Sequence, residues 1–370
     1  MILLIILIII LNNNLLLINY LFKFKNNFIS FKTFSFVLKQ YMGVPMETMN
    51  RNQVIQEISQ LLSGGGFETS QVYYQSCFDM AARKKLLLIL LKVLVNIDSV
   101  NEAHVQEIRK VASTFLASPL VVGVKSKTHK LEEDVVYERH GLPVIGIDTL
   151  KNIILYDEYP EFLADRGGYY VNINGNILKE YRDEYSLSLK DLADLAHVSR
   201  ETIYKYENDM VRANPETAMI LEDILNMKIT VDIDLFNIKS DKTDFNKISS
   251  DNSINNEKTK DLANLGFGVL ETKSTPFDAL AIEKGVNDYS TEENPLIASL
   301  DSNRPEKTLH KMAISLKDLS LITDSDSFFI VNNKKIKDSL DGIPVIRSWE
   351  LKEAEDSKEF LNLVKERRDN

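Results

Sequence analysis

The sequence has a single cysteine, Cys77, in 370 residues, so no disulfide can form within one chain. This scarcity is typical of proteins from a reducing compartment, and we expect a cytoplasmic protein. Histidine is also scarce: the chain has 5, and none stands at metal-ligand spacing from a cysteine or a cluster of carboxylates. We therefore expect no metal site and no cofactor.

Positive charge is in short supply as well. Lys and Arg together number 44 against 54 Asp and Glu, which gives a formal net charge of −10. A surface of this sign does not attract polyanions over its whole area, so any contact with nucleic acid must be local. The hydrophobic fraction of 44% and the charged fraction of 26% are typical of a soluble globular protein, and the length leaves room for about two or three domains.

The longest apolar runs stand at the start of the chain, where the first 22 residues read MILLIILIIILNNNLLLINYLF. Each run is too short to span about 30 Å of hydrocarbon, and one helix through both would bury three asparagines in lipid. Sequence without a clear period follows. We interpret residues 1–45 as a low-complexity apolar extension that is not part of the native protein. A membrane anchor is the alternative; in our interpretation the protein contacts no membrane.

The rest of the chain predicts a protein of α/β plus all-α class. The nearly continuous apolar run at 86–95 is typical of a strand buried on both faces, and shorter strands are expected at 72–74 and 78–82. The polar residues at 239–260 predict a flexible linker. We divide this part into an α/β domain at 46–160, a connecting hairpin at 161–175, a helical domain at 176–230, a flexible linker at 231–260 and a second α/β domain at 261–366.

The two expected α/β domains carry similar marks in the same order. GGGFETS and CFDMAAR at 64–83 correspond to LGFGVLETKSTPFDALAIE at 265–283, and LPVIGIDTLKN at 142–152 corresponds to IPVIRSWELKE at 343–353. We interpret the second domain as a degenerate repeat of the first. The alternative is two unrelated α/β domains with similar strand composition.

Residues 176–230 predict four short helices. Ser188 and Asp191 have the spacing of a capping box at the start of the second helix, and Ser199 stands as the N-cap of the third. An Asn-Pro pair at 214–215 opens the fourth. The helices are therefore delimited by their caps.

The third of these helices has an apolar back, Ile203 and Tyr206, and a polar start that we expect to face outward. A recognition helix touches base edges and phosphates in the major groove with its N-terminal residues. Arg200 suits a guanine edge because a guanidinium matches its O6 and N7 acceptors, while Lys205 suits the phosphate backbone. We expect the contacts with double-stranded DNA to come from Ser188, Ser199, Arg200, Glu201, Thr202, Tyr204 and Lys205.

These helices resemble the helix-turn-helix of phage Cro and repressor proteins. The residues that carry the resemblance are Leu187, Ser188, Leu192, Ala193, Val198, Ser199, Ile203, Tyr206 and Glu207. The resemblance implies a lambda-repressor-like helix-turn-helix domain, and an ion pair between Arg182 on the first helix and Glu207 at the end of the third. Two features depart from the pattern. Residues 176–230 hold seven basic and eleven acidic residues, and His197 stands where the family usually has a turn glycine.

Over roughly residues 46–365, the chain resembles the helix-turn-helix transcriptional regulators of methanogenic archaea. The first α/β domain, the stretch RGGYYVNINGN and the helices after it carry this resemblance. It implies a DNA-binding regulator, and no catalytic activity comes with it.

Asp79 and the strand after it raise an enzymatic alternative. An Asp on one strand and Glu-x-Lys on the next resembles the restriction-endonuclease-like core, in which two carboxylates hold Mg²⁺ and a lysine lies near the attacked phosphate. Lys92 is present here, but Leu90 occupies the Glu position, and the strand after Asp278 in the second copy also lacks the pair. We therefore expect two related restriction-endonuclease-like α/β domains that flank the helix-turn-helix and have no catalytic residues.

Three functions remain open at this point. The interpretation we favour is a sequence-specific DNA-binding transcriptional regulator that reads the major groove with the helix after Ser199. The alternatives are a DNA-processing, nuclease-like enzyme targeted by the same helices, and a protein-binding scaffold. Because one helix-turn-helix reads only a few base pairs, we expect a homodimer, with the α/β domains as its interface.

Overall fold

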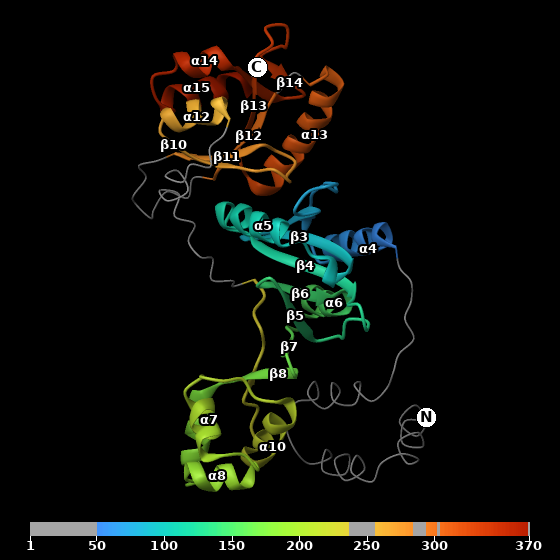
Figure 1. Cartoon of the computed structure of the whole chain (residues 1–370), viewed down its shortest axis with the longest axis vertical. Coiled ribbons are helices and arrows are strands. Elements are labelled where there is room, and N and C mark those ends of the chain that lie inside the picture. Colours follow the sequence, from blue (N-terminus) through green and yellow to red (C-terminus); the bar gives the residue numbers. More distant parts are fainter. Residues whose placement is uncertain (1–49, 237–255, 284–293, 302–303, 369–370) are drawn as a thin grey trace. The chain divides into compact units, whose positions relative to one another are not determined.

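Figure 1 shows a computed structural model of the chain, which describes residues 50–236, 256–283, 294–301 and 304–368. Residues 1–45 and most of the expected linker lie outside this part. The described residues form two compact units. The helical unit comprises Glu132–Tyr137 and Glu158–Ile233, and the α/β unit comprises the described parts of Thr48–Leu131, Glu138–Asp157 and Asp234–Asn370.

The first α/β domain, which we define as the part of the α/β unit before residue 158, is built around a buried strand. This strand, β3 (Leu87–Asn96), follows the prediction at 86–95. Its strands are the first five of a nine-stranded sheet, in the order β1-β2-β3-β4-β6, antiparallel from β1 to β3 and parallel from β3 to β6. Its other elements are α4 (Arg51–Gly64), β1 (Glu68–Thr69), β2 (Met80–Lys84), a 3-10 turn (Ile97–Ser99), α5 (Glu102–Thr114), β4 (Ser118–Lys125), β6 (Leu142–Gly146) and α6 (Ile147–Tyr156).

The strand expected at 72–74 is wrong. This segment belongs to an irregular loop at 70–79 between β1 and β2, within which the amide of Tyr73 donates to the carbonyl oxygen of Asp79 at 2.8 Å. The ring of Tyr73 packs edge-on against Phe78, with 5.6 Å between the ring centroids. The apolar and aromatic side chains therefore fill the loop, and their preference for strands misled the prediction.

The second α/β domain comprises the described residues from 256 onward. Its sheet has the order β10-β11-β12-β13-β15-β14, with antiparallel pairs from β10 to β12 and parallel pairs from β12 to β15. The first five strands thus follow the same sequence of pairings as the first sheet. The elements are α12 (Glu257–Asn264), β10 (Phe267–Glu271), β11 (Ala279–Glu283), β12 (Leu296–Leu300), α13 (Glu306–Thr323), β13 (Ser327–Val331), β14 (Ser339–Leu340), β15 (Ile343–Arg347), α14 (Ser348–Glu353) and α15 (Ser357–Arg368).

The helical unit combines four helices with four strands. Strands β5 and β7 are parallel, and β8 and β9 continue antiparallel in the order β5-β7-β8-β9. The pieces expected as a connecting hairpin and as part of the first α/β domain therefore pack with the helices. The elements are β5 (Val135–Arg139), β7 (Phe162–Asp165), β8 (Gly168–Ile173), α7 (Gly175–Glu184), α8 (Leu189–Leu195), α9 (Arg200–Glu207), α10 (Pro215–Leu225) and β9 (Thr230–Val231).

Helices α7, α8 and α9 all end in the same type of turn, and in none of the three is the left-handed residue of that turn a glycine. The residue after each C-cap has a left-handed backbone, with φ of 54° at Ser186, 56° at His197 and 52° at Asp209. At each end the next amide reaches back to a carbonyl of the last turn; Val198, for example, donates to the carbonyl of Ala193 at 3.0 Å. This closing hydrogen bond helps to offset a left-handed conformation that costs an L-residue about 1–2 kcal/mol. His197 thus adopts the conformation for which the family usually has a glycine.

Candidate nucleic-acid interface

Helix α9 is fixed at its start by a cap and along its back by burial. The Ser199 hydroxyl accepts a hydrogen bond from the Thr202 amide at 3.0 Å, so the predicted N-cap is confirmed. Ile203 is fully buried and Tyr206 is 5% exposed, and burial raises the pKa of the Tyr206 hydroxyl. The opposite side of the helix is left to solvent.

The residues on that outer side differ in how strongly they are engaged. Arg200 and Glu201 are exposed and Tyr204 is 43% exposed. The Thr202 hydroxyl lies 2.8 Å from the Ser199 hydroxyl, and the Lys205 ammonium lies 3.7 Å from the Glu201 carboxylate. Residues 200, 201, 204 and 205 share one face of the helix, because residues three and four apart are neighbours on its surface.

Ser188 lies at the start of the preceding helix, α8, and forms the predicted capping box. Its hydroxyl accepts from the Asp191 amide at 3.1 Å, and the Asp191 carboxylate accepts from the Ser188 amide at 2.9 Å. The pKa of the Asp191 carboxyl is lowered mainly by its hydrogen bond with the Ser188 side chain, and next by the bond from the Ser188 amide. The expected fourth helix begins at Pro215 after Asn214, but the Asn214 side chain makes no capping hydrogen bond.

The predicted ion pair between Arg182 and Glu207 is confirmed. Arg182 Nε lies 2.5 Å from Glu207 Oε1, and Nη2 lies 3.3 Å from Oε2. The side chains are 10% and 5% exposed, so this pair is shielded from water. Arg182 Nη1 also donates to the carbonyl of Leu187 at 2.8 Å. The bond to Glu207 is the main cause of a raised pKa at Arg182, and the pair ties the end of α9 to α7.

A glycine makes this tie possible. A Cβ on Gly175, the first residue of α7, would lie 2.5 Å from the carbonyl oxygen of Glu207. Only glycine therefore allows the start of α7 to approach the end of α9 so closely. The Asp209 carboxylate also accepts from the Gly175 amide at 3.0 Å. In the sequence, only the Asn-Gly pair at 174–175 marks this close approach.

The basic residues of the helical unit divide into two groups. Four of the seven between 176 and 230 form ion pairs within 4.0 Å, which are Arg182 with Glu207, Lys205 with Glu201, Arg212 with Asp165 and Lys228 with Glu161. Among the described residues, Lys179, Lys190 and Arg200 make no such pair. Arg200 is the one that stands at the exposed start of α9.

Asp79, the residue of the enzymatic alternative, is a second candidate centre. Its carboxylate is fully buried, and Oδ2 accepts from the Val93 amide at 2.7 Å. Lys92 Nζ lies 3.2 Å from Oδ1. Leu90, at the position of the missing glutamate, is fully buried. The single carboxylate is therefore held by strand β3 on one side and by a cation on the other.

No signal in the sequence pointed to the second cation at this centre. Arg51, the first residue of α4, places Nη2 2.6 Å from Asp79 Oδ1 and donates through Nε to the carbonyl of Val93 at 3.1 Å. Two cations thus face one carboxylate, an arrangement that leaves no charge to attract a metal ion. In the described part of the chain, no cluster of three or more His, Cys, Asp or Glu could hold one.

A cavity of about 340 Å³ adjoins this centre, and Arg51, Lys92 and His104 are among the residues that line it. Cys77 also borders it. The pKa of the Cys77 thiol is raised to about 12, mainly by burial and secondly by the charge of Glu107. The thiol is therefore protonated at neutral pH and a poor nucleophile.

The corresponding aspartate of the second domain, Asp278, has a similar setting with different partners. Its Oδ2 accepts from the Leu300 amide at 2.7 Å and from the Ser299 hydroxyl at 3.0 Å, and Arg304 lies 3.5 Å from Oδ1. Ser299 precedes Leu300 as Lys92 precedes Val93, so a hydroxyl stands where the first domain has its lysine. Neither aspartate has a second carboxylate at the Glu-x-Lys position.

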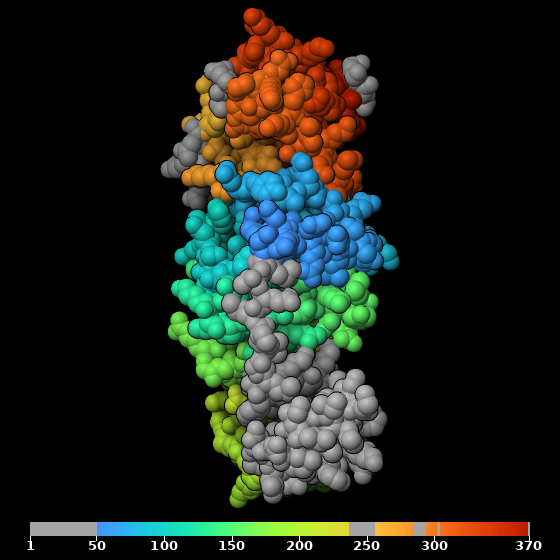
Figure 2. All heavy atoms as spheres, turned by 90° about the vertical axis from the view of Figure 1, so that its right-hand side faces the viewer, coloured from blue at the N-terminus to red at the C-terminus, as the bar shows by residue number. Residues whose placement is uncertain are grey.

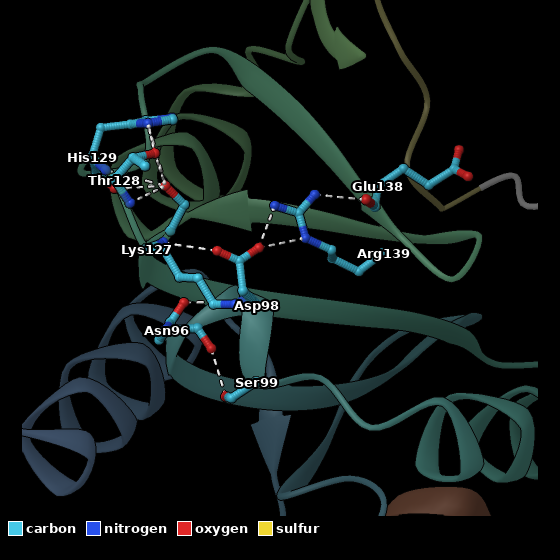
Figure 3. Close-up of polar contacts among 9 residues, drawn as sticks. Asn96, Asp98, Ser99, Lys127, Thr128, His129, Glu138 and Arg139 are labelled. Atoms are coloured by element: carbon cyan, nitrogen blue, oxygen red, sulfur yellow. Dashed lines mark hydrogen bonds and ion pairs between the residues drawn. The ribbon is translucent and has the colours of Figure 1, made fainter. Parts of the chain in front are cut away.

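Figure 3 shows a polar cluster around Asp98, which lies where β3 and β4 end. Both Asp98 oxygens are occupied: Oδ1 accepts from Arg139 Nη2 at 2.7 Å and from Nε at 3.0 Å, and Oδ2 accepts from the Lys127 amide at 2.8 Å. Desolvation alone would raise the pKa of Asp98, but the bonds from Lys127 and Arg139 outweigh it and lower that pKa. The cluster ties strands together, and it engages both oxygens of Asp98.

None of the helices in the described residues is both long enough and apolar enough to cross a membrane.

Comparison with known proteins gives two family matches. Residues 51–160 match the model of the PD-(D/E)XK superfamily domain, and residues 178–231 match a helix-turn-helix model. The protein therefore combines a PD-(D/E)XK-like α/β domain with a helix-turn-helix domain, as the sequence led us to expect.

Whole-length relatives come from archaea and bear the provisional name HTH-type transcriptional regulatory protein. One from Methanobrevibacter smithii is 56% identical over 323 residues, which cover 87% of this chain and 99% of the relative. Another, from Methanothermobacter thermautotrophicus, is 52% identical over 87% of this chain and 98% of the relative. A third, from Pyrococcus furiosus, is 31% identical over 86% and 99%. The predicted resemblance to regulators of methanogens is confirmed.

Proposed function

The chain belongs to this family of archaeal helix-turn-helix transcriptional regulatory proteins, and from that premise we propose that it binds double-stranded DNA sequence-specifically and regulates transcription. The observation that supports the proposal most strongly is the position of Arg200. Its exposed guanidinium stands at the start of a helix that the Arg182–Glu207 ion pair holds in place. A recognition helix needs both properties, because base contacts require a free donor and a rigid support.

Each outward residue of α9 has a role in this proposal. Arg200 donates to the O6 and N7 of a guanine. Glu201 accepts from a cytosine amino group, and Thr202 and Tyr204 contact a thymine methyl or a phosphate. Lys205 exchanges its weak pair with Glu201 for a backbone phosphate. Ser188 and Ser199 bring the starts of α8 and α9 to the phosphates, where helix N-termini favour anions.

We propose further that the α/β domains have no nuclease activity and need no cofactor. The support is the buried Leu90 and the commitment of Arg51 and Lys92 to Asp79, since two-metal or one-metal hydrolysis requires carboxylates free to hold Mg²⁺. A plasmid incubated with the protein and either Mg²⁺ or Mn²⁺ should stay supercoiled. Nicking or linearisation would establish the enzymatic alternative.

The domain organisation is part of the same proposal. We take 46–160 and 261–366 as related domains around the helix-turn-helix at 176–230, joined by the hairpin at 161–175 and the linker at 231–260. The shared order of strand pairings supports this relation. We also propose a homodimer that reads two half-sites in the cytoplasm, where the DNA of an archaeon lies. Sedimentation with and without DNA tests the stoichiometry.

Selection of bound fragments from random duplex DNA tests the proposed function itself. A sequence-specific regulator should enrich a short motif over successive rounds, and binding to that motif should exceed binding to scrambled DNA by about 10³-fold or more. A protein-binding scaffold would enrich none. Because acidic residues outnumber basic ones around α9, we expect weak non-specific binding to DNA. Contacts with phosphates weaken as the salt concentration rises, so the selection should be done at low salt.

A further inference from the structure

Helix α13 of the second domain holds the loop between β1 and β2 of the first domain. The Gln71 amide donates to Asp318 Oδ2 at 2.8 Å, and the Tyr73 hydroxyl donates to the same oxygen at 2.7 Å. The Gln71 side-chain amide also donates to the Ser315 hydroxyl at 2.9 Å. These bonds lie within the α/β unit, and one carboxylate thus receives two donors from the other domain.

Helix α5 of the first domain holds the corresponding loop of the second domain in the same manner. Glu107 Oε1 accepts from the Lys273 amide at 2.5 Å and from the Ser274 amide at 2.9 Å. The ring of Phe115, at the end of α5, meets Phe277 edge-on with 6.2 Å between the centroids. Each domain therefore contributes a helix and receives one.

The loops and helices that exchange these bonds are equivalent elements of the two domains. Gln71 and Lys273 each stand two residues after the first strand of their sheet ends, at Thr69 and Glu271. Helices α5 and α13 each connect the third strand to the fourth. Contacts of this reciprocal kind, in which patch i meets patch j and j meets i, define a two-fold interface.

The two loops also touch each other, as expected where a two-fold axis passes. The carbonyl of Ser274 accepts from the Cys77 amide at 2.6 Å and from the Ser76 hydroxyl at 3.2 Å. The pKa of the Tyr73 hydroxyl is raised, mainly by burial and secondly by the hydrogen bond to Asp318. Figure 2 shows blue residues of the first domain against orange residues of the second.

We propose that the two α/β domains form an internal pseudo-two-fold dimer, in which the face of α5 and α13 is closed within one chain. The hydrogen bonds to Glu107 and Asp318 are charge-assisted and therefore among the stronger kind. Because this face is occupied within the chain, it does not pair one copy with another. A homodimer on DNA then uses another surface, and each internal dimer carries one helix-turn-helix. The inference does not depend on DNA binding.

Cross-linking tests whether the contact lies within one chain. The variant Gln71→Cys/Ser315→Cys places thiols on the two sides of the interface, while the native Cys77 is buried. With a short bismaleimide we expect a cross-linked product at monomer mass, in a yield that does not change when the protein is diluted. A product at dimer mass whose yield falls on dilution would overturn the proposal. So would no product at all, provided that each single-cysteine variant still reacts with a maleimide.

Hydrogen exchange tests the two carboxylates. Glu107→Gln should accelerate exchange in the loop at 272–277, and Asp318→Asn in the loop at 70–78, each by about 10- to 100-fold, as expected on weakening a hydrogen bond to a charged group. Glu353→Gln, which removes an exposed charge of the second domain, is the control and should change neither loop. Exchange unaltered in both interface variants would contradict the reciprocal contact.

Discussion

The start of α9 and the centre at Asp79 both carry cations, but the two sites engage these cations in opposite ways. At α9 the ion pair of Arg182 with Glu207 lies behind the helix, and Arg200 is left exposed. At Asp79 both nearby cations, Arg51 and Lys92, are bound to the one buried carboxylate. A phosphate-rich partner can bind the exposed guanidinium of Arg200 far more readily than cations that already pair with a buried carboxylate.

In our proposal, this difference distinguishes a DNA-reading surface at α9 from a structural centre at Asp79. An exposed guanidinium keeps its donors for a ligand, whereas a buried carboxylate with two cations has already satisfied its charge and most of its hydrogen bonds. Asp278, whose side chain is 28% exposed, also accepts from its neighbouring strand, through Ser299, and lies 3.5 Å from Arg304. We therefore propose that the two aspartates stabilise their domains and that α9 contacts DNA, and each variant below tests one of these two roles.

The largest effect is expected at the support of α9. Arg182→Met should lower the free energy of unfolding of the helical unit by about 3–5 kcal/mol, because the buried Glu207 would lose its partner. Chemical denaturation followed by circular dichroism measures this loss. Lys179→Met on the same helix removes a cation that makes no ion pair and should change stability little. Equal losses in both variants would contradict the role of the pair.

The next effect concerns Asp79. Asp79→Asn should lower stability by about 1.5–3 kcal/mol, since hydrogen bonds to a charged group are lost while the shape is kept. Asp148→Asn removes an exposed carboxylate, 3.4 Å from Lys130, and should cost less than about 1 kcal/mol. A gain in stability for Asp79→Asn would instead indicate strain that is kept for function, and would break the comparison.

A smaller effect is expected at Lys205, which lies on the reading face but away from base edges in our account. Lys205→Ala should weaken binding to all DNA sequences alike and should reduce the slope of log affinity against log salt by about 1. Titrations at several salt concentrations measure both quantities, with Lys179→Ala as the control. Loss of preference at a single base position would instead make Lys205 a reader.

The smallest effect is a pH dependence at Asp98. Its pKa is lowered in the folded protein, so the stabilisation that it contributes is present above the unfolded pKa of about 3.9 and is lost as pH falls through the folded pKa. Asp98→Asn should therefore cost about 1 kcal/mol near pH 7 and less near pH 3. Unfolding at the two pH values, compared with the wild type, measures the difference. An equal cost at both would contradict it.

Local patterns in the sequence were enough to predict the parts of the site that depend on neighbours in the chain. The Ser188–Asp191 box and the Ser199 cap follow from spacing along the helices, and the Arg182–Glu207 pair follows from the family resemblance. Contacts over long distances in the sequence could not be predicted in this way. Arg51 reaches Asp79 because α4 packs on β3, and no periodicity near Arg51 signals that contact.

The expected strand at 72–74 failed for a related reason. Its side chains have strand propensity, but the loop that contains them is held by bonds to the distant helix α13, such as that from Tyr73 to Asp318. The strand β5 likewise joins the helical unit through its pairing with β7, although the sequence assigns it to the first α/β domain. Tertiary contacts decide such segments, and propensity is too weak to oppose them.

The central claim is that α9 reads DNA through Arg200, and one measurement tests it most directly. Affinities of the wild type and of Arg200→Ala should be compared on the selected site and on all its single-base variants. We predict a loss of about 1–3 kcal/mol in the variant on the selected site, with preference relaxed at one base position and retained at the others. If Arg200→Ala binds with unchanged affinity and unchanged preference at every position, α9 is not the reading helix.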